Sequence, residues 1–241
     1  MNFGISFDFW NTLYGNGDEP ERHNRRVEYF YNLISTYIDT DYETIEKAFS
    51  ASTKYFLHEW HNNFRTPTAR ERIQLMSDKL SVKLKENDIE RAVDYFGKLI
   101  FLVPPVFNSQ NLEIVRQLSK IYPIGLISDT GYISGKFIRQ FLTEQEMISP
   151  FTSLVFSDEQ PHCKPHNSVF KLTCKNLNVK CSQLIHIGDL EKTDIKGANE
   201  SGGIAIRYTG WNNVESDHSL AKYIVDDYQK LSQTITEIVN R

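Results

Sequence analysis

The feature of this sequence that most restricts its fold is a set of six short apolar runs, each bounded by turn-forming residues. Every run after the first follows a segment with helical spacing of its apolar residues, and this alternation favours a parallel sheet covered by helices. The runs occupy residues 4–7, 124–127, 153–156, 184–187, 204–207 and 223–225. We therefore predict an α/β fold with a doubly wound parallel sheet.

More than a hundred residues separate the first run from the second, which is more than one crossover connection needs. Apolar residues three or four positions apart indicate four helices in this interval. The stripes are Val27, Phe30, Ile34 and Tyr37; Ile45, Phe49, Phe56 and Trp60; Ile73, Met76 and Leu80; and Ile89, Val93, Phe96 and Ile100. We predict a helical cap domain at residues 16–103, inserted into a core domain formed by residues 1–15 and 104–241.

Local signals suggest where these helices begin and end. Thr40 with Glu43 has the spacing of a capping box for the second helix. Thr66 followed by Pro67 is typical of an N-cap and first-turn proline, here for the third helix. The prolines at 104 and 105 would end the helical region and return the chain to the sheet.

The composition restricts the partners and the compartment. A net charge of −4 gives no general positive field for a polyanion, so nucleic acid is not an expected partner. Three cysteines without metal-binding or disulfide spacing favour a reducing compartment. No apolar run approaches the roughly 20 residues that span a bilayer, and no signal peptide is recognisable. We expect a cytoplasmic protein without a membrane partner; its oligomeric state does not follow from the sequence.

Polar residues close four of the apolar runs, where a parallel sheet normally binds its ligand. Asp8 closes the first run, and Ser128, Asp129 and Thr130 close the second. Lys164 follows the third run, and Asp189 closes the fourth, with Asp194 five residues later. These side chains are therefore expected to meet at one edge of the sheet.

The order and spacing of these residues resemble the four motifs of the haloacid dehalogenase superfamily of phosphotransferases and hydrolases. The resemblance covers nearly the whole chain and implies a Rossmann-like core with a helical cap between the first and second motifs. It places Asp8 at the nucleophile, Ser128 at the second-motif hydroxyl and Lys164 at the third-motif lysine. Asp189 and Asp194 match the acidic fourth motif.

The resemblance implies phosphoryl transfer to Asp8 and a bound Mg²⁺ ion. Hard oxygen ligands suit Mg²⁺, and the implied metal site comprises Asp8, Asp189, Asp194 and the backbone carbonyl of Trp10. Ser128 and Lys164 would stabilise the charge of the transferred group. Candidate contacts to a small phosphorylated substrate are Trp10, Asn11, Thr12, Asp129, Thr130 and Arg65, although a solvated loop position is an alternative for Arg65.

One position departs from the pattern of the family's phosphatases. These enzymes usually carry a second aspartate two residues after the nucleophile, which protonates the leaving group and then activates water, and this chain has Trp10 there. Loss of such an acid/base group typically costs about 10²- to 10⁴-fold in rate. Trp10 is either a packing residue against the cap or a wall that excludes water.

Three functions accommodate this departure. The first is a Mg²⁺-dependent phosphohydrolase that uses activated leaving groups, such as acyl phosphates, or takes a proton from the cap or the substrate. The second is a 2-haloacid dehalogenase, because such enzymes also lack the second aspartate; however, Asp189 and Asp194 keep the metal-binding form of the fourth motif. The third is a non-catalytic, regulatory phosphate-binding protein.

Overall fold

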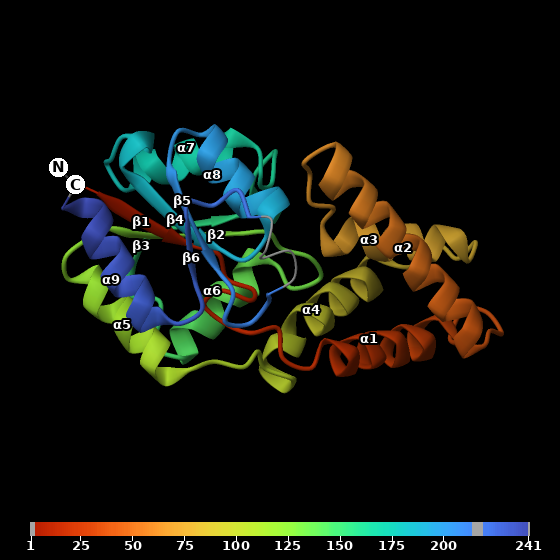
Figure 1. The fold of residues 1–241 in the computed structure, drawn as a ribbon. Coiled ribbons are helices and arrows are strands. Elements are labelled where there is room, and N and C mark those ends of the chain that lie inside the picture. Colours follow the sequence, from red (N-terminus) through yellow and green to blue (C-terminus); the bar gives the residue numbers. More distant parts are fainter. Residues whose placement is uncertain (1–2, 214–218, 241) are drawn as a thin grey trace.

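A computed structural model describes residues 3–213 and 219–240 and shows a parallel β-sheet with helices on both faces (Figure 1). The six strands lie in the order β3-β2-β1-β4-β5-β6, and all neighbouring pairs are parallel. The strands are β1 (Gly4–Phe7), β2 (Ile124–Ser128), β3 (Phe151–Phe156), β4 (Leu184–Gly188), β5 (Ile204–Tyr208) and β6 (Tyr223–Val225). The predicted α/β fold is confirmed.

Strand β1 lies in the middle of the sheet because it pairs with β2 on one side and β4 on the other. Phe7, its last residue, is in register with Leu126 and Ile187. The side chains of β1 alternate between the two faces, and all four of its residues are buried. The register brings the carboxyl ends of three strands together, directly before the polar residues that the sequence places there.

Helices α5 (Ser109–Ser119), α6 (Gly135–Glu144) and α9 (Tyr228–Val239) cover one face of the sheet. Helices α7 (Asn167–Asn176) and α8 (Lys196–Glu200) cover the other (Figure 1). Each face has its own cluster of buried apolar side chains, one including Ile5 and Phe7 and the other including Ile127 and Phe170. Burial on both faces explains why the strands read as continuous apolar runs.

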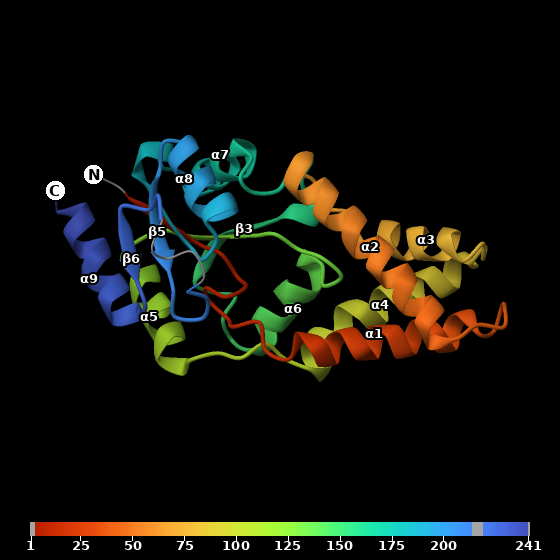
Figure 2. The same ribbon diagram turned by 45° about the vertical axis from the view of Figure 1, so that its right-hand side comes forward.

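Four helices follow β1 and form a separate lobe beside the sheet (Figure 2). They are α1 (Glu19–Ile34), α2 (Tyr42–Asn62), α3 (Ala69–Lys79) and α4 (Glu86–Leu102). Their inward stripes enclose a hydrophobic core of their own, which includes Phe30, Phe49 and Phe96. The predicted helical insertion between the first two strands is confirmed. We refer to these four helices as the cap.

The two chain segments that join the cap to the sheet run side by side. Gly15 and Val106 exchange both backbone hydrogen bonds, with N···O distances of 2.9 and 3.1 Å. Arg22 donates to the carbonyl of Val103 at 2.8 Å and thereby ties the start of α1 to the end of α4. These contacts lie beside the expected junctions at 15/16 and 103/104, and the domain boundaries themselves stay a prediction.

The helix starts differ in detail from those predicted. The N-cap of α2 is Asp41, whose carboxylate accepts a hydrogen bond from the amide of Thr44, so the prediction of Thr40 was wrong. The N-cap of α3 is Thr68, which forms a capping box with Glu71. The prediction of Thr66 was therefore also wrong. In both cases a neighbouring residue with an equally good acceptor side chain and extended backbone takes the position.

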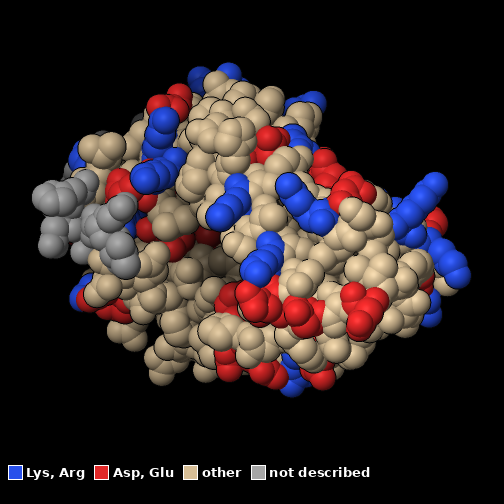
Figure 3. Space-filling view, turned by 90° about the vertical axis from the view of Figure 1, so that its right-hand side faces the viewer, with Lys and Arg blue, Asp and Glu red and all other residues tan. Residues whose placement is uncertain are grey.

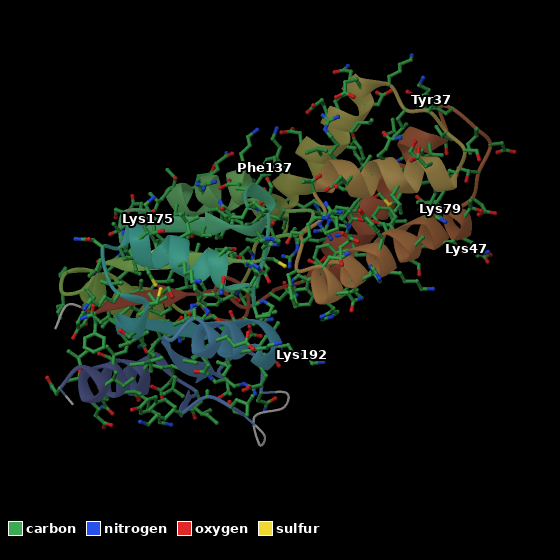
Figure 4. The ribbon with its side chains drawn as sticks, turned by 90° about the horizontal axis from the view of Figure 1, so that it is seen from above. Tyr37, Lys47, Lys79, Phe137, Lys175 and Lys192 are labelled. Carbon is green, nitrogen blue, oxygen red and sulfur yellow. The ribbon has the colours of Figure 1, made fainter. Side chains whose placement is uncertain are left out.

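The cap and the core also contact each other through side chains. Tyr132, from the loop after β2, packs into the cap core against Phe49 and Phe96. The ring of Phe137 on α6 lies so close to Gly97 on α4 that a Cβ at that glycine would be 2.0 Å from it. Figure 4 shows Phe137 on the side of the core next to the cap, with Tyr37, Lys47 and Lys79 at the far end of the cap. Helices within the described ranges are all too short or too polar to cross a membrane.

Candidate active site

The site lies at the carboxyl ends of the central strands. Asp8 follows β1, and its amide donates to the carbonyl of Ile187 in β4 at 2.8 Å. Ser128 ends β2, and Asp189 follows β4. Lys164 comes from the segment between β3 and α7 and is 2% exposed. Residues far apart in the sequence thus reach one edge of the sheet.

Lys164 bridges two buried carboxylates. Its ammonium nitrogen lies 2.7 Å from Oδ1 of Asp8 and 2.6 Å from Oδ1 of Asp194. Burial lowers the pKa of Lys164, but the charges of Asp194 and Asp8 outweigh it and hold the pKa above its ordinary value. The lysine therefore stays charged and fixes the orientation of Asp8.

Asp194 is held by four donors. Its Oδ1 accepts from Lys164 and from His186 Nε2 at 3.0 Å, and its Oδ2 accepts from the Leu190 amide and the Thr193 hydroxyl, both at 3.1 Å. Burial raises its pKa, yet Lys164 and the hydrogen bond from His186 bring the pKa well below the usual range. Asp194 is consequently an ionised, fully hydrogen-bonded anchor.

Local geometry places Asp194 in this position. It lies on a π-helical turn, η3 (Glu191–Ile195), directly after β4. A Cβ at Gly188 would be 2.3 Å from the carboxyl carbon of Asp194, so only glycine allows this approach. On the far side, the Ser6 hydroxyl lies 2.9 Å from Nδ1 of His186 and orients the ring.

The pKa values of Asp8 and Asp189 are shifted in the opposite direction from that of Asp194. Burial raises the pKa of Asp8 well above its ordinary value, and Lys164 only partly offsets it. Burial and the charge of Asp194 raise the pKa of Asp189 to about 6. One carboxylate oxygen from each of the three aspartates lies within 4.8 Å of the others. One ammonium thus faces three carboxylates, and a divalent cation would balance the remaining negative charge.

A cavity of about 210 Å³ opens over these carboxylates. The core contributes Asp8, Lys164 and Asp189, and the cap contributes Phe56 and Trp60. The indole of Trp60 donates to Oδ2 of Asp129 at 2.8 Å, so the cap is hydrogen-bonded to the loop after β2, which lines the same cavity as Asp8. Asp129 also accepts from the amide of Lys164 at 3.1 Å.

Only some of the other predicted site residues line this cavity. Trp10, Asn11, Asp129 and Thr130 line the cavity, but Thr12 and Ser128 do not and are both buried. Ser128 Oγ bonds only weakly to the Asp129 carbonyl, at 3.3 Å.

The guanidinium of Arg65 is held away from the cavity. It bonds to Glu59 at 2.8 Å, to Glu71 at 2.7 Å and to the hydroxyl of Tyr55 at 2.6 Å. Each of its three nitrogens has a partner within the cap, and Arg65 does not line the cavity with the other predicted site residues.

Several cavity residues were not singled out as site residues from the sequence. Asn212 donates to Oδ2 of Asp189 at 2.8 Å, although it lies on a loop after β5 with no recognisable motif. Phe56 and Trp60 belonged to the predicted apolar stripe of α2, yet they are only partly buried and face the cavity. In the sequence, the signal for these two residues was that the apolar stripe of α2 continues past the residues that form the cap core.

The outer face of the cap has a mixed charge. Lys and Arg side chains lie among Asp and Glu side chains on the face shown in Figure 3. Within the cap, oppositely charged side chains also pair at helical spacing, such as Lys98 with Asp94 at 2.6 Å. No extended field of one sign covers this face.

The profile of the haloacid dehalogenase-like hydrolases matches residues 4–202, which include every element of the site described above except Asn212. The chain belongs to this family of hydrolases. A curated relative, the glyceraldehyde 3-phosphate phosphatase of Methanocaldococcus jannaschii, is 23% identical over 239 residues, covering 98% of this hydrolase and 97% of the relative.

Solved structures share the fold of this hydrolase over nearly its whole length. A 2-haloacid dehalogenase from Pseudomonas syringae has a TM-score of 0.71 at 14% identity and covers 98% of this chain and 99% of its own. A HAD phosphatase from Thermococcus onnurineus has a TM-score of 0.69 at 18% identity, with 98% of each chain covered. A HAD-hydrolase from Bacillus subtilis bound to magnesium has a TM-score of 0.64 at 11% identity, covering 97% of this chain and 99% of its own.

Proposed function

We propose that this hydrolase is a Mg²⁺-dependent phosphohydrolase that acts on a small phosphorylated metabolite through a phosphorylated Asp8. The observation that carries the proposal is the buried group of three carboxylates around one lysine, beside a cavity large enough for a small ligand. The excess negative charge needs a divalent cation before an anionic phosphate can enter. The phosphatase from Methanocaldococcus jannaschii supports the same class of substrate.

The arrangement suits nucleophilic catalysis at Asp8. Its Oδ1 is bonded to Lys164, whereas its Oδ2 has no hydrogen-bond partner in the part of the chain that the structure describes. Oδ2 would attack phosphorus and form an acyl phosphate, which water then hydrolyses. The ammonium of Lys164 would neutralise charge on the transferred group without leaving its present position.

The residues at the site fit a magnesium ion. We infer that Asp8, Asp189 and the carbonyl of Trp10 would hold it, because hard oxygen donors are what Mg²⁺ requires. Both oxygens of Asp194 already accept two hydrogen bonds, so Asp194 would supply charge and orientation and need not bind the ion directly. When bound, the metal would screen Asp8 from the substrate phosphate and polarise its oxygens.

Trp10 limits which phosphates can react efficiently. Its side chain lines the cavity and packs edge-on against Phe9, with ring centroids 4.8 Å apart, and an indole carries no transferable proton at neutral pH. The leaving group must then depart without help from this position. We expect faster turnover of acyl phosphates than of alkyl phosphates, since a carboxylate leaves without protonation.

The second candidate is a 2-haloacid dehalogenase, favoured by the same tryptophan, since a halide also leaves unprotonated. The fold of the Pseudomonas syringae enzyme is compatible with it. The negative charge of the site counts against a dehalogenase. The carboxylate of a 2-haloacid would be repelled by the aspartates, and displacement of a halide does not need a metal ion to offset that charge. A non-catalytic phosphate-binding protein remains the third candidate, distinguished by binding without turnover.

A substrate panel with an Asp8→Asn control tests these candidates. The panel comprises acyl phosphates, alkyl and aryl phosphates and 2-haloacids, each with Mg²⁺ and with EDTA. We expect Mg²⁺-dependent phosphate release that is highest for acyl phosphates and absent in Asp8→Asn. Asp39→Asn, an exposed change of equal charge, serves as the matched control. Metal-independent halide release would contradict the proposal, and phosphate binding without turnover of any compound would favour the regulatory alternative.

A further inference from the structure

A second cavity, of about 300 Å³, adjoins the first. The two cavities adjoin, because both are lined by Trp10, Asn11, Phe56, Asp129 and Thr130. The second cavity is lined in addition by two cap arginines, Arg26 of α1 and Arg72 of α3. Neither arginine was identified as a site residue from the sequence.

The two arginines are buried with too few partners. Arg26 and Arg72 are 3% and 6% exposed. Arg26 donates from Nη1 to Glu19 at 2.6 Å, but its buried Nε has no hydrogen-bond partner. Arg72 donates from Nε to the hydroxyl of Ser52 at 3.1 Å and pairs with no carboxylate in residues 3–213 and 219–240. A buried guanidinium without a counter-ion is costly, which points to a missing anion.

The nearby acidic groups do not supply this anion. Glu19 lines the same cavity, but its two oxygens are already shared between Arg22 Nε at 2.7 Å and Arg26. Burial raises the pKa of Asp129, and its two oxygens already accept hydrogen bonds from the Trp60 indole and the Lys164 amide. Glu19 thus pairs with Arg22 and Arg26, and Arg72 is left without a paired carboxylate among the residues that the structure describes.

The aromatic ring of Tyr132 holds both guanidinium groups in place. The Cζ atom of Arg72 lies 3.5 Å from the ring centroid, and that of Arg26 lies 5.1 Å from it. The Nη1 atom of Arg72 also lies near Gly131, where an added Cβ would be 3.9 Å away. Stacking fixes the guanidinium planes before a ligand binds, which favours two-point recognition of a carboxylate or phosphate.

We propose that Arg26 and Arg72 form a second anion subsite, which selects phosphorylated substrates carrying another carboxylate or phosphate at the opposite end. The inference rests on the proposed function, since the first phosphate would occupy the cavity over Asp8. The two cavities adjoin, so one small molecule would span both. The cap arginines would thereby bind the second anion of the substrate, while Asp8 in the core reacts with its phosphate.

The test measures binding in the Asp8→Asn background, so that turnover does not enter. Titration calorimetry with Mg²⁺ present compares three matched series of two to five carbons: alkyl phosphates, ω-phosphorylated carboxylates and alkane bisphosphates. We expect the doubly anionic ligands to bind more tightly than the alkyl phosphates of equal length. Arg72→Gln should weaken their binding by about 10- to 100-fold, as expected for losing hydrogen bonds to a charged group, and change alkyl phosphate binding by less than about threefold. The carboxylate and bisphosphate arms identify which anion fits.

Controls separate recognition from folding. Arg70→Gln removes an exposed arginine on the same helix, paired with Glu86 and Glu90, and should leave both ligand classes unaffected. Arg26→Gln and Arg72→Lys repeat the comparison if Arg72→Gln fails to fold. Equal loss of affinity for both ligand classes, or no preference for a second anion in Asp8→Asn with both arginines intact, would overturn the subsite. If the protein with Asp8 intact releases phosphate from none of these ligands while Asp8→Asn still prefers the doubly anionic ones, the proposed function is overturned and the subsite stands.

Discussion

Replacing Asp189 with asparagine should stabilise the metal-free protein while removing a metal ligand. The carboxylate of Asp189 is 2% exposed, and its pKa lies at about 6 rather than the ordinary 3.8. A pKa difference of one corresponds to about 1.4 kcal/mol, so the ionised form costs the folded protein about 3 kcal/mol at pH 8. Asparagine keeps an acceptor for Asn212 and removes this cost.

The sign of the pH dependence follows from the raised pKa. In the unfolded chain Asp189 loses its proton near pH 4, whereas in the folded protein it does so near pH 6. The folded state therefore loses stability as the pH rises through this range, and the loss is constant above it. We expect the gain from Asp189→Asn to be largest at pH 8 and about half as large at pH 5.

Urea denaturation at both pH values, in EDTA and in Mg²⁺, measures the effect. Saturating Mg²⁺ should stabilise the parent protein by about 2.7 kcal/mol at a hundredfold excess over its Kd, and should stabilise Asp189→Asn much less. Asp39→Asn controls for net charge. A variant that is less stable than the parent at pH 8 in EDTA, or a gain that does not change with pH, would refute this electrostatic reasoning.

Three further changes test other parts of the structure. Lys164→Met should cost about 3–5 kcal/mol in urea denaturation, because it leaves buried carboxylates without their counter-ion; an unchanged midpoint would contradict this. Trp10→Asp should raise alkyl phosphate turnover at least about tenfold in a phosphate-release assay, and a lower rate would mean that the missing acid is not limiting. Thr68→Ala should cost about 1 kcal/mol of stability by breaking the capping box with Glu71, whereas Thr66→Ala should not remove a helix cap.

The parallel sheet and the helical insertion could be predicted because each depends on local periodicity. Apolar runs buried on both faces mark the strands, and three-to-four spacing marks the cap helices. The helix starts were less accurate, since Asp41 and Thr68 compete with nearby residues of equal capping ability. Such competition is decided by backbone geometry that no short sequence pattern contains.

The sequence by itself determined that Asp8, Lys164 and Asp189 would be near one another, because the carboxyl ends of neighbouring parallel strands share an edge. It did not determine their pairing. Only the tertiary structure places one ammonium between two carboxylates, and only it shows that the oxygens of Asp194 are fully used.

The arginine cavity likewise depends on tertiary structure alone. Arg26, Arg72 and Tyr132 belong to two cap helices and a core loop, and each would pass as an ordinary surface or packing residue in its own segment. Burial without a counter-ion is a property of the assembled fold, since it depends on which side chains are absent around a charge as well as on which are present. The sequence determined which polar side chains stand at the strand ends. The packing of the cap against the core determined which side chains surround the cavities and therefore which ligands can bind there.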